Sequence, residues 1–190
     1  MVAVAGGVAQ PEVVIRERIE LANPSGLVRR NAYHAARGLE PAAAADLVET
    51  AARIAAEQAA ETLGQMVRRA TAEGAEVRSC AVVVGAPAGE VRLESILASH
   101  ALVHAAEGRL YQRALLEGAE ARGLEAIGFP KQSIWEQGEA ALGVPRDELR
   151  RWIDRRRREV GPPWGGGSEA GSARRLDRAR ATEPLGGIVD

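Results

Sequence analysis

The chain has 190 residues, of which 46% are hydrophobic, 3% are aromatic and 27% are charged. This length suits one domain whose core is built mainly from Ala, Val, Leu and Ile. The formal net charge of −1 excludes a general electrostatic attraction to nucleic acid or to a membrane. Cys80 is the only cysteine, which excludes a disulfide framework and a zinc site built from cysteines.

The cellular location is predicted from what the chain lacks. No apolar run approaches the roughly 20 residues that a membrane-spanning helix needs. The first residues also lack the basic region of a secretion signal. We therefore expect a cytoplasmic protein with no membrane partner. Lys131 is the only lysine among 25 basic residues, a bias typical of a GC-rich genome.

The N-terminal part of the chain contains one expected strand. Residues 1–11 are expected to be flexible. Residues 13–21 alternate between apolar and polar side chains as a half-buried strand does, except that Glu17 falls on the apolar side. A turn follows at 23–26, and residues 29–38, which carry Tyr33 and His34, are compatible with a loop or a short helix.

A long helix and a buried strand are expected next. Pro41, which suits a first-turn position, begins an Ala-rich helix predicted to run to about Thr71 and to end at Gly74. Residues 76–85 form a strand that is apolar on both faces at its centre. Such a run is typical of a central strand covered on both sides.

Four further segments follow. We predict a helix over 92–121, a short strand over 124–129, a helix over 133–142 and a helix that begins at Pro145. Residues 165–190 are rich in Gly, Ala and Arg and are expected to be a disordered tail.

The order of these elements predicts the fold class. Strands alternate with helices, which favours a single α/β domain over residues 12–164. We expect a layered helix–sheet–helix arrangement with a parallel or mixed sheet, in which 77–85 is the central strand. Pairing with a second copy of the chain, as a homo-oligomer, would supply a missing strand.

The helix over 92–121 carries the main candidate site. His100, His104, Glu107 and Tyr111 fall on one stripe at 100° per residue, on the side that also carries the apolar residues. Ionisable groups that face a core must be paired, hydrogen-bonded or functional, because unpaired burial is unfavourable by several kcal/mol. We expect His104 and Glu107, one turn apart, to share a hydrogen bond.

Three interpretations of this stripe remain open. Histidines four residues apart on a helix can direct both imidazoles at one metal ion, with a third ligand from Glu107, Glu17 or His34. A polar pocket that binds a ligand without a metal is the second interpretation. In the third, the imidazoles and Glu107 form a structural polar network.

Two other features suggest nucleic-acid chemistry. Glu17 lies on the inward side of a strand, where a nuclease could hold a metal-binding carboxylate, but a pair with a neighbouring arginine explains it as well. A basic helix could contact phosphates, although most of its arginines are expected to be a solvated face. These residues are Arg146, Arg150, Arg151, Arg155, Arg156, Arg157 and Arg158.

Three segments resemble a family of uncharacterised bacterial proteins. They are residues 30–34 (RNAYH), 96–108 (ILASHALVHAAEG) and 161–164 (GPPW), and the likeness covers roughly residues 13–164. The resemblance implies a ribonuclease H-like α/β architecture and carries no known activity. The expected first-strand aspartate is missing, which argues against nuclease activity.

Two functional hypotheses follow from the sequence. In the first, the protein binds a ligand or hydrolyses a phosphorylated or nucleic-acid substrate. His100, His104 and Glu107 are then the candidate catalytic residues, and Tyr111, Glu17 and His34 are candidate binding residues. In the second, it is a non-catalytic interaction or scaffold module.

Overall fold

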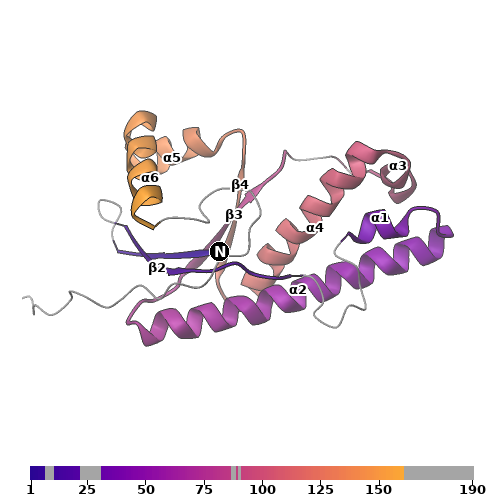
Figure 1. The fold of residues 1–190 in the computed structure, drawn as a ribbon, viewed down its shortest axis with the longest axis horizontal. Helices are drawn as coiled ribbons and strands as arrows, with labels where there is room; N and C mark the ends of the chain where they lie inside the picture. The colour runs from indigo at the N-terminus through magenta and orange to yellow at the C-terminus, as the bar shows by residue number, and fades with distance from the viewer. Residues whose placement is uncertain (7–10, 22–30, 87–88, 90, 161–190) are drawn as a thin grey trace, which may run out of the picture. The chain divides into compact units, whose positions relative to one another are not determined.

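The computed structural model describes residues 1–6, 11–21, 31–86, 89 and 91–160 (Figure 1). These residues form a mixed α/β arrangement in which the strands make two separate pairs. The chain divides into two compact units at Arg151, within the last helix, and the elements below belong to the first unit unless stated otherwise. The expected tail over 165–190 and the motif at 161–164 lie outside the described residues.

The N-terminus contains a strand that the sequence did not predict. Strand β1 (Val2–Ala5) pairs antiparallel with β2 (Glu12–Arg16). The backbones of Met1 and Glu17 close the end of this pair, because each donates a hydrogen bond to the carbonyl oxygen of the other. Strand β2 therefore ends at Arg16, earlier than the predicted residue 21.

The long helix forms as predicted. Helix α1 (Ala32–Ala36) precedes α2 (Pro41–Ala72), which starts at its proline and is followed by Gly74 in the left-handed region, with φ of 80°. The buried stripe of α2 is mostly alanine, so a neighbouring helix can approach closely. Helix α4 (His100–Glu120) packs along this stripe.

The single helix predicted over 92–121 is wrong, because the structure has two helices there. Helix α3 (Leu93–Ala98) ends at Ser99, whose φ of −116° and ψ of 120° are extended. The Ser99 hydroxyl oxygen accepts a hydrogen bond from the Leu102 backbone N–H at 3.4 Å. Serine is a favoured N-cap because it satisfies a first-turn N–H that has no helical partner. His100 is consequently the first residue of α4.

The predicted strand over 77–85 forms, but its predicted place at the centre of a sheet covered on both faces is not observed in the part of the chain that the structure describes. Strand β3 (Ser79–Val84) pairs parallel with β4 (Glu125–Pro130) in the register Ser79↔Glu125 to Val84↔Pro130. Within the described residues β4 is its only partner strand, and α4 covers one face of the pair. Val82 is 7% exposed, whereas Val83 is 49% exposed. An apolar run predicts a strand, but cover on its second face depends on tertiary structure.

Threonine substitutions at Val82 and Val83 test which face is covered. Val82→Thr should lower the free energy of unfolding by about 1–3 kcal/mol, because it places a hydroxyl group in an apolar contact. Val83→Thr should change it by less than about 0.5 kcal/mol, as expected for an exposed site. Urea denaturation of both variants measures the difference. Equal losses would mean that both faces of β3 are covered.

The remaining helices form as predicted. They are α5 (Ile134–Leu142) and α6 (Arg146–Val160). Glu139 of α5 connects them, since its carboxylate accepts hydrogen bonds from the Arg146 backbone N–H at 2.7 Å and from Arg146 Nε at 3.2 Å. Among the described helices, none combines the length and the apolar character needed to cross a bilayer.

Candidate metal centre

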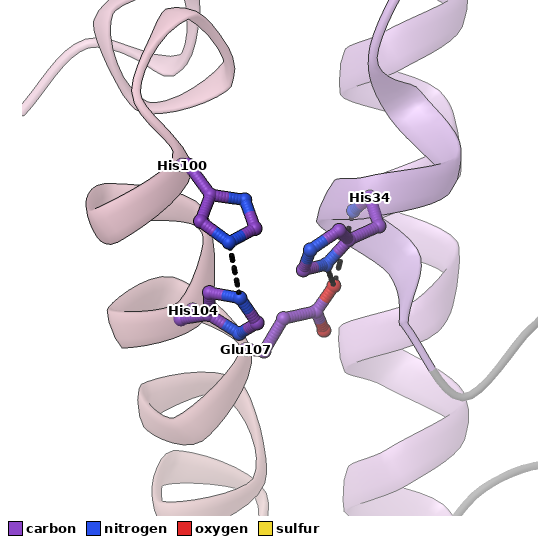
Figure 2. Close-up of polar contacts among 4 residues, drawn as sticks. All are labelled: His34, His100, His104 and Glu107. Atoms are coloured by element: carbon purple, nitrogen blue, oxygen red, sulfur yellow. Dashed lines mark hydrogen bonds and ion pairs between the residues drawn. The ribbon is translucent and has the colours of Figure 1, made fainter.

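The three histidines of the chain converge on one place. His34 comes from α1, and His100 and His104 come from α4 (Figure 2). Each offers a potential ligand atom, and these atoms all lie within 4.8 Å of one another. His34 was one of three candidate third ligands in the sequence, and the structure brings it to the pair. Within the described residues this is the one cluster of three or more potential ligands.

Local packing fixes the two elements that carry the imidazoles. The Ser99 cap starts α4 at His100, so that His100 and His104 project from successive turns toward α1. Helix α1 is only five residues long and depends on tertiary contacts. Its Ala32, 2% exposed, packs in a cluster with Leu110 of α4 and Ala55 of α2. The cluster holds α1 against both long helices.

His100 and His104 contact each other directly. Their Nε2 atoms are 3.0 Å apart, so one nitrogen must donate a proton and the other must accept it. At least one imidazole is therefore neutral. Two nitrogens that bind one tetrahedral zinc ion lie about 3.3 Å apart, given zinc–nitrogen distances of about 2.0–2.1 Å. The observed pair is close to this geometry and exposed to solvent.

Glu107 contacts His34 instead of His104. Its Oε1 accepts a hydrogen bond from the His34 backbone N–H at 3.1 Å and lies 3.5 Å from His34 Nδ1. The predicted His104–Glu107 hydrogen bond is therefore wrong. One helical turn places these residues side by side, but α1 presents an N–H group to the carboxylate, which turns toward α1 (Figure 2).

Two buried polar atoms at this place lack hydrogen-bond partners. They are His34 Nδ1 and Glu107 Oε2. Nδ1 is within ion-pair distance of Glu107 Oε1, but the contact lacks hydrogen-bond geometry. Buried polar groups are nearly always paired, so each exception needs an explanation such as a bound ion or water. One of these atoms belongs to an imidazole of the cluster, and the other belongs to the carboxylate that contacts this imidazole.

Two tyrosines pack against the apolar cluster that contains Ala32, Ala55 and Leu110. Tyr33 and the predicted binding residue Tyr111 both pack against the Leu110 cluster. Burial raises the pKa of the Tyr33 phenol; Arg109 and Arg113 oppose this rise, while Glu107 adds to it. Tyr33 is therefore a neutral phenol near neutral pH. Tyr111 lies in the packing between helices, one turn beyond Glu107.

Glu17, the other predicted binding residue, is not brought to the histidines. Its carboxylate accepts a hydrogen bond from Arg69 near the end of α2. The paired-carboxylate explanation from the sequence matches this contact. A two-metal nuclease needs several carboxylates within a few ångströms of one another. Glu17 belongs to no such group within the described residues.

Two of the predicted phosphate-binding arginines contact tryptophan rings. Arg150 lies over Trp135 at 5.2 Å, and in the second compact unit Arg156 lies over Trp152 at 5.7 Å. Arg156 also pairs with Glu159. Such contacts are ordinary for an amphipathic helix, so nucleic-acid binding by α6 stays a prediction.

No family model, no curated protein and no solved structure matches this chain. The resemblance to an uncharacterised bacterial family and the ribonuclease H-like architecture therefore stay predictions. The candidate metal centre is supported by the geometry of the chain's own residues.

Proposed function

We propose that this protein binds one divalent transition metal ion through His34, His100 and His104. The observation that carries the proposal is the convergence of the chain's three histidines from two separate helices, with potential ligand atoms within 4.8 Å of one another. Imidazole is a preferred ligand of zinc, copper, nickel and iron. Zn²⁺ suits the site best, since it commonly takes three protein ligands and keeps a fourth position open.

An accessible fourth position would support hydrolytic chemistry. His100 and His104 are exposed, so a metal ion between them would remain in contact with solvent. Zinc lowers the pKa of a bound water toward neutrality and thereby supplies hydroxide. This extends the hydrolytic hypothesis drawn from the sequence. Phosphorylated or nucleic-acid substrates, a ribonuclease H-like topology and a cytoplasmic location remain parts of the proposal.

A scaffold or interaction module is the second candidate. The hydrogen bond from His34 to Glu107 and the contact between His100 and His104 favour it, because they satisfy several polar groups without a ligand. In that case the cluster is a structural network that holds α1 to α4. Metal binding separates the two candidates.

Metal titration of the full-length chain without a histidine tag tests the proposal. We expect about one Zn²⁺ per chain in calorimetry, and a gain in stability of about 2.7 kcal/mol at a free concentration of 100 times Kd. Replacing Zn²⁺ with Co²⁺ should give the visible absorption of a tetrahedral site. Alanine at any one of the three histidines should weaken binding at least about tenfold, since each removes a ligand.

Gln65→Ala is the control, because Gln65 is an exposed polar residue of α2 outside the cluster. It should bind zinc as the wild type does. A wild-type protein that shows neither binding heat nor a gain in stability would overturn the metal proposal. The scaffold candidate would then be favoured, especially if the histidine variants lose stability.

A further inference from the structure

The geometry points to Glu107 as the positioning residue of the metal centre. We propose that its carboxylate holds His34 in the tautomer with the proton on Nδ1, so that Nε2 is the atom that binds the metal. This inference rests on the proposed function and adds to it the ligand atom of His34 and the residue that selects it. Glu107 itself is not a ligand in this arrangement.

The surroundings of Glu107 support this role. It is the one charged residue buried among the described residues, at 9% exposed. A carboxylate is rarely buried without partners, because the loss of hydration is unfavourable. The backbone N–H of His34 supplies one partner at 3.1 Å. The same oxygen, Oε1, faces His34 Nδ1 at 3.5 Å.

The tautomer follows from the donor and acceptor roles. An ionised carboxylate only accepts hydrogen bonds, and a neutral imidazole has one donor and one acceptor nitrogen. A proton on Nδ1 is attracted to the negative charge of Oε1 at 3.5 Å, whereas a lone pair on Nδ1 would be repelled by it. The Nδ1–H tautomer leaves the lone pair on Nε2. Figure 2 shows the side of the ring that bears Nε2 turned toward His100 and His104.

This arrangement matches a general feature of metal sites. A ligating histidine usually donates its second ring N–H to a carboxylate or carbonyl oxygen, which fixes both the tautomer and the orientation of the ring. Glu107 also holds the backbone of the residue whose ring it orients. One side chain therefore contacts both the backbone of His34 and the ring nitrogen whose proton decides which nitrogen binds the metal.

Imidazole-selective ¹⁵N NMR on the metal-free wild type tests the tautomer directly. The chain has three histidines, so the spectrum contains three imidazole patterns, and His34→Ala assigns one of them. We expect His34 to be the Nδ1–H tautomer. A dominant Nε2–H tautomer would overturn the proposal without any variant at Glu107 having to fold.

Zinc titration of Glu107→Gln tests the effect on binding. Glutamine keeps an oxygen that can accept from the His34 backbone but removes the charge that favours the Nδ1 proton. We expect an affinity loss of about 10–100-fold, together with a mixed tautomer at His34. Glu120→Gln, the same change at the exposed end of α4, should alter neither. Unchanged affinity and tautomer in Glu107→Gln would overturn the positioning role.

The outcomes separate this inference from the proposed function. If the wild type binds zinc while Glu107→Gln matches it, the metal site stands and Glu107 does not position His34. If the wild type binds no zinc, the proposed function fails, and the positioning of a metal ligand fails with it. Even then, the tautomer in the metal-free protein reports whether Glu107 orients the ring.

Discussion

Replacement of Gly118 by alanine is expected to lower the free energy of unfolding by about 2 kcal/mol or more. A Cβ at Gly118 would lie 2.7 Å from the Ala60 backbone nitrogen and 2.8 Å from Ala59 Cβ. Both distances are too short, and backbone atoms cannot move aside unless α2 and α4 separate. Overpacking is unfavourable by about 1–3 kcal/mol and occasionally more, and a clash with backbone atoms belongs to the upper end of this range. Subtracting the gain of about 1 kcal/mol from helix propensity leaves a net loss of about 2 kcal/mol or more.

Gly108→Ala is the matched control for Gly118→Ala. It is the same change in the same helix, but a Cβ at Gly108 meets nothing within 4 Å. Alanine should therefore stabilise the protein by about 0.5–1 kcal/mol, because glycine is the poorer helix former. Chemical denaturation should give opposite signs for the two variants. A loss at both positions, or at neither, would contradict the close approach of α2 and α4 at Gly118.

Local patterns predicted most of the helices and strands. The span of α2 followed from Pro41, the alanine periodicity and Gly74, all of which act within a few residues. Strands β3 and β4 followed from short apolar runs bounded by turn residues. Signals that act locally are present in one sequence and need no knowledge of tertiary neighbours.

The predictions were wrong where two local signals compete or where the structure depends on residues distant in the sequence. At Ser99 helical periodicity continues unbroken, but the hydroxyl group caps a new helix and interrupts it. A serine directly before the histidine segment was a usable signal for this break. Strand β1 depends on its partner β2, and the exposure of Val83 depends on what covers the sheet. Neither property is encoded locally.

The candidate site also has a part that local sequence predicts and a part that depends on tertiary contacts. The spacing of His100 and His104 on one helix predicted that their imidazoles would lie together, because 3.6-residue periodicity fixes this. The third residue could not be chosen from Glu17, His34 and Glu107 by sequence alone. Which residue joins the pair depends on how α1 packs against α4. This packing brings together His34 and Glu107, which are 73 positions apart in the sequence.

Leu110→Ala is expected to lower the free energy of unfolding by about 3 kcal/mol, within the range for leucine truncation in a core. Leu110 is 8% exposed and lies in the cluster that joins α1, α2 and α4, where its buried neighbours are alanines. Small neighbours on helix backbones cannot expand to fill the space of a lost isobutyl group. Leu142→Ala, at a leucine that is 42% exposed, should lower it by less than about 1 kcal/mol.

The same substitution should weaken zinc binding, although no ligand is changed. Leu110 packs against Ala32 of α1, so its truncation should reduce the fraction of molecules in which His34 is docked beside His100 and His104. Apparent affinity falls in proportion to the fraction of the binding-competent state. Calorimetry should show weaker binding by Leu110→Ala and unchanged binding by Leu142→Ala. Full zinc affinity in a destabilised Leu110→Ala protein would mean that α1 is held by the Glu107 contact and not by the apolar cluster.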